Sequence, residues 1–400
     1  MLKKVSLIIL AVIMLFNMSV FAEEAVVVEE IVESTEGKIK VACVGDSITQ
    51  GVGLTETYPM VLQNELGDKF VVENFGVSGT SALKSSKIPY VNKPQYADSL
   101  AFDADIVCIM FGTNDIKDEN WPEGKDNFKA DYKAIIDSYK EVNPDVKVYI
   151  GVPPAILKLN VYGERNPEIL ENEGIPMIKE LADEIGAKKV DLFELFKGYE
   201  SLFPDFLHPN DEGAAMMAKA FGEAIITDGA SKWAKNEIMS AYENNLIPEC
   251  VMEDYKAVIT REAFCEMVVR MFDAGEKAPK APFTDVDNES VDKAYALGIV
   301  NGVSETSFNP KANITREEMA AMLTRAFKKI AGTEDIAVEE KIFPDNDKIS
   351  SWAISDVIVM NGFGIMKGDE NGNIRPLDNT TNEEAILLVC RTFVLAGSLK

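Results

Sequence analysis

His208 is the only histidine among the 400 residues of the chain, and Asp205 stands three positions before it. An imidazole titrates near neutral pH, so histidine is the side chain most often used to move a proton in catalysis. A carboxylate three residues upstream on a turn can orient the ring and stabilise its charged form. We therefore take His208 as the candidate base of a hydrolase, with Asp205 as its partner, and ask which group it would activate.

Ser47 is the candidate nucleophile. It follows an apolar run at residues 39–44, which predicts a buried strand, and the segment Gly-Asp-Ser-Ile-Thr at residues 45–49 predicts a turn into a helix. A serine at such a turn can present its hydroxyl at the edge of a sheet, and the amides that follow can point at an oxyanion. The alternative for Ser47 alone is a helix N-cap, the more common role of serine in this position. We expect Asp46 to support the turn.

Two further residues could stabilise an oxyanion. Gly79 comes shortly after the second predicted strand and has no side chain, so its amide can come close to a substrate. Its alternative is an ordinary turn glycine, and Gly76 is a rival. Asn114 follows the third predicted strand and either donates from its side-chain amide or caps a turn. Its neighbour Asp115 is a weaker candidate than Asp205 for orienting the histidine, because it belongs to a different segment.

The elements that must position these residues extend over residues 38–228, where strands alternate with helices. This alternation predicts a parallel sheet covered on both faces. In such sheets the site lies beyond the carboxyl ends of the strands, so the candidates, which follow strands or precede the last helix, are expected to meet at one edge. The expected strands are residues 39–44, 70–74, 106–111, 147–152 and 189–192, and the expected helices are residues 58–66, 128–142, 167–185 and 212–226.

In this order along the chain, these segments resemble the SGNH/GDSL hydrolase family. The family's four sequence blocks correspond here to Ser47, Gly79, Asn114 and the pair Asp205/His208, with Gly-Asp-Ser-Ile in place of the frequent Gly-Asp-Ser-Leu. The resemblance implies a flavodoxin-like, three-layer α/β/α fold with a five-stranded parallel sheet, and ester hydrolysis without a metal or cofactor. It also implies a Ser47–His208–Asp205 triad, and an oxyanion hole made by the amides of Ser47 and Gly79 and the side chain of Asn114.

The surroundings of these blocks indicate a substrate class. Three segments look like those of the subset of this family that removes acetyl groups from carbohydrates. They are Trp121 soon after Asn114, Gly-Val-Pro-Pro at residues 151–154 and Leu-Phe-Pro-Asp at residues 202–205. Trp121 either stacks on a sugar ring or packs beneath its loop, and Pro153 is a second candidate for substrate contact. No long apolar segment suggests a lid over a fatty acyl chain, which favours a short acyl group.

A sequence repeat begins near residue 229. Ile-Thr-Arg-Glu at residues 259–262 recurs at residues 314–317 and, degraded to Thr-Thr-Asn-Glu, at residues 380–383. We expect each motif threonine to cap the helix that follows, with a glutamate two or three residues later completing a capping box. The expected helices are residues 233–245, 290–297 and 352–360 before the motifs, and residues 263–272, 318–327 and 385–395 after them.

These repeats resemble S-layer homology (SLH) modules. The expected modules are residues 229–277, 278–330 and 341–400. The resemblance implies a mainly helical unit of three modules that binds secondary cell-wall polysaccharide without a covalent bond. Arg261 and Arg316 would pair with an acidic sugar, because a guanidinium fork matches a carboxylate. The third module has Asn382 at this position, so its groove is expected to bind weakly or not at all. The alternatives are that these arginines form structural salt bridges, or that the repeats serve protein association only.

The N-terminus and the composition indicate where the protein acts and which partners it can have. Residues 1–22 have the charged start, apolar run and small residues of a secretory signal, followed by an acidic spacer at residues 23–37, and no membrane span is expected after the signal is removed. A net charge of -26 argues against a nucleic-acid partner. The odd number of cysteines and their spacing predict neither a disulfide framework nor a zinc site, and Cys43 and Cys108 are expected to be buried in strands.

The sequence therefore predicts a secreted serine ester hydrolase, attached non-covalently to the bacterial cell wall or S-layer and acting on an O-acetylated glycan. One alternative is a broad-specificity esterase, lysophospholipase or thioesterase on the cell surface. Another is a surface-layer structural or adhesion protein whose esterase fold is inactive. The complete set of nucleophile, base, orienting carboxylate and oxyanion donors weighs against the inactive protein.

Overall fold

The computed structural model describes residues 37–154, 158–159, 165–272, 277–333, 336–339 and 341–398. The expected signal peptide and all but the last residue of the expected spacer lie outside the described residues. The hydrolase-like region and the repeats are described in turn.

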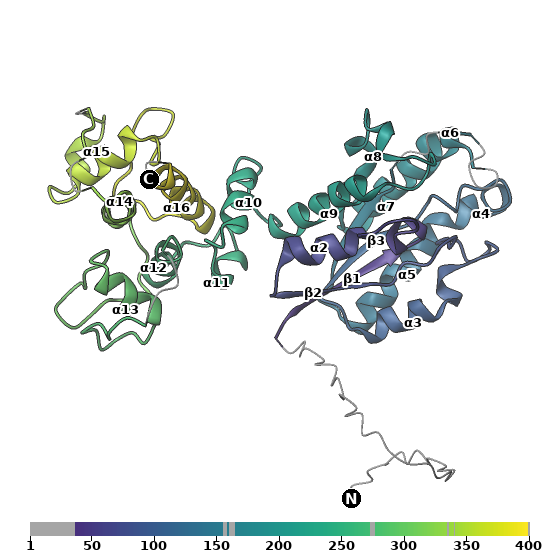
Figure 1. The fold of residues 1–400 in the computed structure, drawn as a ribbon, viewed down its shortest axis with the longest axis horizontal. Coiled ribbons are helices and arrows are strands. Elements are labelled where there is room, and N and C mark those ends of the chain that lie inside the picture. Colours follow the sequence, from purple (N-terminus) through teal and green to yellow (C-terminus); the bar gives the residue numbers. More distant parts are fainter. Residues whose placement is uncertain are drawn as a thin grey trace, which may run out of the picture. The chain divides into compact units, whose positions relative to one another are not determined.

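A parallel sheet of five strands forms the centre of the hydrolase-like region, in the order β2-β1-β3-β4-β5 (Figure 1). This order is that of flavodoxin-like folds, in which ligands bind where the strand order reverses, here between β1 and β3. The predicted parallel sheet is confirmed. Its strands are β1 (Ile39–Gly45), β2 (Phe70–Asn74), β3 (Ile106–Met110), β4 (Lys147–Val152) and β5 (Lys188–Asp191).

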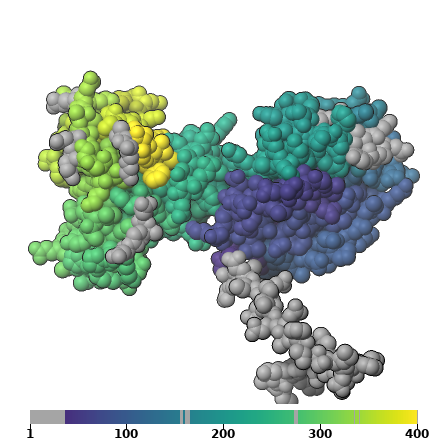
Figure 2. Space-filling view, viewed as in Figure 1, coloured from purple at the N-terminus to yellow at the C-terminus, as the bar shows by residue number. Residues whose placement is uncertain are grey.

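Helices pack against both faces of the sheet, and Figure 2 shows the outer surface of the same region from the same side. The helices against one face are α2 (Tyr58–Leu66) and α9 (Asp211–Ile226), and those against the other are α3 (Pro94–Ala101), α5 (Phe128–Val142) and α7 (Ile175–Ile185). The short helices of this region are α1 (Ser47–Gln50), α4 (Trp121–Gly124), α6 (Pro167–Ile169) and α8 (Leu192–Leu195).

Each central strand contributes to two cores, because successive side chains point to opposite faces. Cys43 packs with the α2 and α9 side, whereas its neighbour Val44 packs with the α5 and α7 side. Cys43 lies opposite Cys108 of β3, and both are buried, as predicted. The continuous apolar runs of β1 and β3 follow from this double burial, which is typical of parallel strands.

The expected helix at residues 167–185 is wrong in one respect. It is divided into α6 and α7 by a π-helical segment, Leu170–Gly174. Pro176 lies in the first turn of α7 and has no amide hydrogen, so it cannot donate to the preceding turn as a continuous α-helix requires. The sequence pattern gave the correct end of the helix but not its interruption.

The repeat region is helical, and its helices are coloured green to yellow in Figure 1. Its helices are α10 (Lys235–Glu243), α11 (Glu249–Met252), α12 (Arg261–Val269), α13 (Glu289–Ala296), α14 (Arg316–Ala331), α15 (Ile354–Gly362) and α16 (Asn382–Gly397). The helices after the motifs begin earlier than predicted. The motif arginine or asparagine is the first helical residue, because the threonine before it is the N-cap in all three cases.

The three motifs join the repeats into a closed ring of backbone hydrogen bonds. The amide of Arg261 donates to the carbonyl of Ala312 at 2.9 Å, and that of Arg316 to Asp378 at 3.1 Å. The amide of Asn382 closes the ring on Ala257 at 2.8 Å. Each repeat therefore holds the next, and the third holds the first, an arrangement with approximate threefold symmetry. In the described part of the chain, no helix is long and apolar enough to span a membrane.

Candidate active site and glycan grooves

Ser47, His208 and Asp205 form a continuous hydrogen-bonded chain. The distance from Ser47 Oγ to His208 Nε2 is 2.8 Å, and His208 Nδ1 lies 2.7 Å from Asp205 Oδ2. Ser47 is the first residue of α1, directly after β1, and its N-cap is Asp46, whose carboxylate accepts from the amide of Ile48. The serine hydroxyl is thus not used as the cap, and it faces the imidazole across a sequence separation of 161 residues.

A tight turn fixes the carboxylate relative to the ring. Asp205 Oδ1 accepts from the amides of Leu207 and His208, at 3.0 and 2.7 Å, while Oδ2 accepts from the imidazole. Burial raises the pKa of Asp205, but these hydrogen bonds and the positive charge of the imidazole outweigh it and hold the pKa below its ordinary value. The carboxylate therefore stays ionised and can stabilise an imidazolium.

The structure separates the two glycines that could approach a substrate. Gly76 packs against the chain, because a Cβ there would lie 2.3 Å from the amide nitrogen of Gln50. Gly79 has a left-handed backbone with φ of +79°, and the nearest atom to a Cβ there would be Ile88 Cδ1 at 3.5 Å. Gly79 is therefore the glycine whose amide can be exposed in this loop, and Gly76 is needed for close packing.

Asn114 is buried behind the nucleophile. Its Nδ2 atom donates to Asp46 Oδ2 at 3.2 Å and to the carbonyl of Thr80 at 3.0 Å. The first bond links Asn114 to the residue that caps the nucleophile's helix, and the second links it to the residue after Gly79. The three candidate oxyanion donors thus belong to one hydrogen-bonded assembly at the carboxyl ends of β1, β2 and β3.

Arg165 is a site residue that sequence reasoning missed. Its Nη2 donates to Asn114 Oδ1, its Nε donates to the carbonyl of Thr113 at 3.2 Å, and the residue is 4% exposed. By occupying the amide oxygen, the guanidinium fixes which way the Asn114 amide points. Arg165 precedes α6 in a connecting segment, and an isolated arginine there has no spacing that would mark it as part of a site.

Two buried carboxylates support the site from behind. Burial raises the pKa of Asp46 to about 6, against the lowering effects of the Ile48 amide and the nearby positive charges of His208 and Arg165. Burial also raises the pKa of Asp115 to about 7. Asp115 accepts from the amides of Leu83 and Gly112 and so holds two loops together, a structural role.

Arg261 and Arg316 each border a groove between repeats. The first groove, of about 240 Å³, is lined by residues that include Arg261, Glu318, Arg325 and Trp352. The second groove, of about 210 Å³, is lined by residues that include Arg316, Glu384, Arg391, Trp233, Lys367 and Arg375. Both grooves thus contain a motif arginine, a glutamate, a second arginine and a tryptophan, and the two tryptophans are exposed.

The two motif arginines are also bound within the protein. Arg261 pairs with Glu318 at 3.0 Å and donates to the carbonyl of Phe308. Arg316 donates to the carbonyls of Ile374 and Lys367, at 2.8 and 3.0 Å. The structural salt bridge that was an alternative for these residues is present at Arg261, and it does not remove either arginine from its groove.

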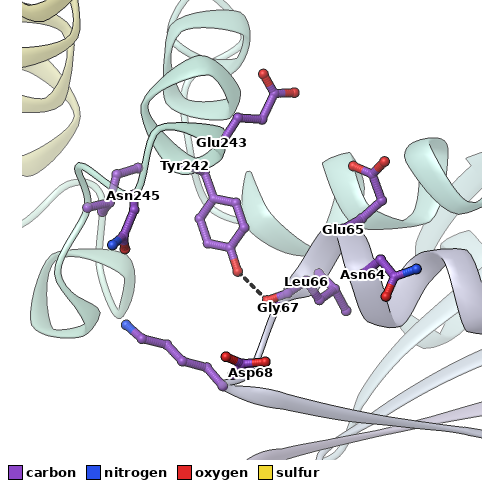
Figure 3. Close-up of a pocket in the computed structure, with 10 residues that line it drawn as sticks. Asn64, Glu65, Leu66, Gly67, Asp68, Tyr242, Glu243 and Asn245 are labelled. Atoms are coloured by element: carbon purple, nitrogen blue, oxygen red, sulfur yellow. Dashed lines mark hydrogen bonds between the residues drawn. The ribbon is translucent and has the colours of Figure 1, made fainter.

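A further hollow is lined by residues 64–69, 242–243, 245 and 247. There the hydroxyl of Tyr242 donates to the carbonyl of Leu66 at 2.6 Å (Figure 3). Its side chains include the carboxylates of Glu65, Asp68 and Glu243, and it contains no residue of the triad. Within the described residues, no group of three or more histidine, cysteine or acidic side chains is arranged to hold a metal ion.

The comparisons with known proteins agree with both halves of the chain. Residues 43–216 match the model of the GDSL-like Lipase/Acylhydrolase family, and residues 282–320 and 342–386 match that of the S-layer homology domain. The chain carries a GDSL-like domain and S-layer homology domains. The first repeat lies outside the matched segments, although its motif takes part in the ring of hydrogen bonds.

Individual relatives match one half or the other. An acetylxylan esterase from Xylanibacter ruminicola is 35% identical over 48% of this chain and 44% of its own length. A surface-layer 125 kDa protein from Lysinibacillus sphaericus is 34% identical over 24% of this chain and 8% of its own. This chain therefore spans less than half of either relative. A crystal structure of an acetyl xylan esterase, AlAXEase, matches 47% of this chain and 100% of its own at 25% identity and a TM-score of 0.39.

Both residues predicted to contact the substrate of the GDSL-like domain are buried. Trp121 is 3% exposed, packs edge-on against Phe128 and donates from Nε1 to Glu173 at 2.7 Å. Its ring is enclosed beneath the loop and is not open to stack on a sugar. Pro153 is also buried, beside Gly112. The loops after β3 and β4 turn both apolar side chains into the core, which for Trp121 is the second of its two expected arrangements, packing beneath the loop.

The third motif position keeps the burial and the carbonyl contact of the other two, but its side chain has no charge. Asn382 is buried and its Nδ2 donates to the carbonyl of Asp254 at 2.8 Å.

The helix of the first repeat lacks a capping glutamate. The third residue of α12 is Ala263, whereas α14 and α16 have Glu318 and Glu384 at this position. This explains why Thr260 caps α12 alone, whereas Thr315 and Thr381 form complete capping boxes. The expectation of a box in every repeat is therefore wrong for the first.

Proposed function

We propose that this chain is a secreted serine ester hydrolase that removes acetyl groups from a carbohydrate and is held at the cell wall by its S-layer homology region. The observation that carries the enzymatic part is the hydrogen-bonded chain from Ser47 through His208 to Asp205. The family of the domain and the acetylxylan esterase among its relatives support the choice of reaction and substrate class.

In the proposed reaction, His208 Nε2 takes the proton from Ser47 as the hydroxyl oxygen attacks the ester carbonyl. The ionised Asp205 stabilises the imidazolium that forms. The amides of Ser47 and Gly79 would donate to the oxyanion, and the side chain of Asn114 would join them by exchanging one of its two present acceptors, Asp46 Oδ2 or the Thr80 carbonyl, for the oxyanion. Each such donor contributes about 3 kcal/mol in comparable sites. His208 then protonates the sugar oxygen as its bond to the carbonyl carbon breaks, which releases the sugar hydroxyl and leaves the acetyl group on Ser47. Water repeats the sequence on the acyl-enzyme, releases acetate and restores Ser47.

A short acyl group fits the surroundings of Gly79. The side chain of Ile88 lies next to this glycine and is 37% exposed, so it would meet the group attached to the carbonyl carbon. A methyl group would contact this side chain without displacing it, whereas a long chain would need a channel past it. Ile88 thus supports acetate over a fatty acid.

Anchoring at the wall is proposed from the two grooves. The first combines two arginines, and the second three, with an exposed tryptophan. Guanidinium groups suit the carboxylate of an acidic sugar, and the indole offers a flat apolar surface beside it. The surface-layer protein among the relatives supports a cell-surface location.

The decisive test of the enzyme is hydrolysis of p-nitrophenyl acetate by wild type and by Ser47→Ala. Loss of the nucleophile should lower turnover by a factor on the order of 10⁴ or more, whereas the exposed-site control Ser85→Ala should match wild type. Equal rates in wild type and Ser47→Ala would refute the proposed enzyme and favour an inactive surface protein.

The substrate class needs its own measurement. Acetate release from acetylated xylan should exceed release of longer acids from matched esters, because the proposed site suits a methyl group. A preference for long acyl chains would instead identify a broad esterase or lysophospholipase. The wall-anchoring part is independent of both results, since purified cell walls should retain the Ser47→Ala variant as well as wild type.

A further inference from the structure

Phe206 is unusual in both its backbone and its exposure. It stands between Asp205 and His208 with φ of +67°, a left-handed conformation that costs energy for a residue with a Cβ. Its ring is 44% exposed, whereas its neighbours Phe203 and Leu207 are buried. The turn requires this conformation, because the Phe206 amide donates to Phe203 while Asp205 accepts from the two amides that follow.

Glycine would adopt this turn without strain, and a polar residue would suit the exposed position. The phenylalanine therefore adds strain and exposed apolar surface, and the core gains little from it. Strained residues of this kind are found at ligand-binding and catalytic sites, where the gain lies in the ligand. We therefore ask which ligand the exposed ring of Phe206 could contact.

The ring lies at the edge of the sheet that carries the triad. Lys158 follows β4, whose carboxyl end is at this edge, and its ammonium nitrogen lies 5.1 Å from the centre of the Phe206 ring. The turn that contains Phe206 leads directly into α9 and holds both Asp205 and His208. An ester carbonyl placed for attack by Ser47 would have its alcohol part close to this turn, because His208 must protonate the departing oxygen.

We infer that Phe206 is the stacking platform for the sugar ring that carries the ester, with Lys158 donating to the sugar hydroxyls. A pyranose or furanose ring presents C–H groups on its face and hydroxyls at its rim. The Lys158 ammonium lies over the Phe206 ring, so a stacked sugar would take the opposite face or displace the ammonium toward the hydroxyls at its rim. This role takes the place of the one predicted for Trp121, whose ring is buried. The inference rests on the proposed deacetylation and specifies how the carbohydrate is recognised.

The test compares two acetate esters, an acetylated xylo-oligosaccharide and ethyl acetate, which has no ring. Phe206→Gly should lower the ratio of their kcat/KM values, sugar over ethyl ester, by about tenfold, the size expected for one aromatic contact. Phe206→Tyr keeps a ring and should restore the ratio. The deacetylated oligosaccharide should also become a weaker competitive inhibitor of ethyl acetate hydrolysis in Phe206→Gly.

A matched control separates recognition from strain. Asp103 is another exposed residue with positive φ, at 53°, and Asp103→Gly relieves the same kind of strain far from the triad in sequence. Both glycine variants should raise Tm, but Asp103→Gly should leave the specificity ratio at the wild-type value. An unchanged ratio in Phe206→Gly would overturn the role of Phe206 but not the proposed deacetylation, whether both rates fall together or neither falls. Wild type that cleaves ethyl acetate but no acetylated sugar would overturn the carbohydrate assignment together with it.

Discussion

Asp46 caps the helix and Ser47 faces the histidine, and the sequence alone could not assign these two roles. A serine after a strand is commonly a helix cap, but here the aspartate before it caps α1, so the hydroxyl is available to His208. The same aspartate accepts from Asn114, which ties the turn of the proposed nucleophile to a proposed oxyanion donor. The candidates Ser47, His208, Asp205, Gly79 and Asn114 could be chosen from the sequence because each belongs to a short segment with its own pattern. Arg165 and Phe206 could not, because their roles depend on loop conformation.

Arg165 should act on catalysis through Asn114. In Arg165→Met the Asn114 amide loses the donor that fixes its orientation, so kcat should fall by about ten- to a hundredfold with a smaller change in KM, less than removal of the oxyanion donor itself. Arg165→Lys should restore little, since a lysine cannot replace both Nε and Nη2. The measurement is a double-mutant cycle with Asn114→Ala, in which the two losses should not add. Additive losses would show that Arg165 acts independently of the amide.

The raised pKa of Asp115 predicts a dependence of stability on pH. With a folded pKa of about 7 against an ordinary value of 3.8, the folded state binds more protons than the unfolded state between these pH values. Its contribution to stability is therefore largest below pH 4 and declines as the pH rises to about 7. Asp115→Asn removes this titration, so its unfolding free energy should fall less than that of wild type from pH 4.5 to 7.5, by up to a few kcal/mol. Urea unfolding at several pH values measures this, with Asp118→Asn at an exposed position as the control for the lost charge. Parallel curves for wild type and Asp115→Asn would contradict the assignment.

At the scale of elements, the strands were the most predictable part and helix boundaries the least. A strand buried on both faces needs an uninterrupted apolar run, and β1 and β3 coincide with such runs to within one residue. Helix starts depend on which residue caps them, and the motif threonines place α12, α14 and α16 two or three residues earlier than their apolar pattern suggests. The ring of hydrogen bonds between repeats joins residues distant in sequence and has no local signal.

The capping boxes predict a difference between two equivalent threonines. The Thr315 hydroxyl accepts from the Glu318 amide and also donates to Glu318 Oε2 at 3.1 Å, whereas Thr260 accepts from Ala263, which has no carboxylate for it to donate to. Thr260→Ala should cost about 1 kcal/mol and Thr315→Ala distinctly more, within the range of up to about 2 kcal/mol for caps. Urea unfolding of the two variants, followed by circular dichroism, makes the comparison. Equal losses would show that the bond from the Thr315 hydroxyl to Glu318 adds nothing.

At the scale of the whole molecule, the net charge of -26 makes attraction to an acidic wall polymer depend on local charge. The second groove has Arg316, Lys367, Arg375 and Arg391 against Asp369 and Glu384, whereas the first has Arg261 and Arg325 against Glu318. An acidic ligand must compete with Glu318 for Arg261 in the first groove and with Glu237 for Arg391 in the second, but the second also offers Lys367 and Arg375. The two grooves are therefore unequal, and the second should provide more of the affinity.

This inequality can be measured with purified cell walls and the full chain. Arg316→Gln should weaken retention more than Arg261→Gln, and the double variant should lose more than either, because two sites on one chain bind with a high effective concentration. Asn382→Ala should retain wild-type binding, since its position offers no cation. Both arginines hold backbone carbonyls, so Tm must be compared across the set, and the rate on p-nitrophenyl acetate should remain at the wild-type value. Unchanged retention in a folded double variant would mean that the wall is bound elsewhere, and a loss in Asn382→Ala would mean that the third position binds without an arginine.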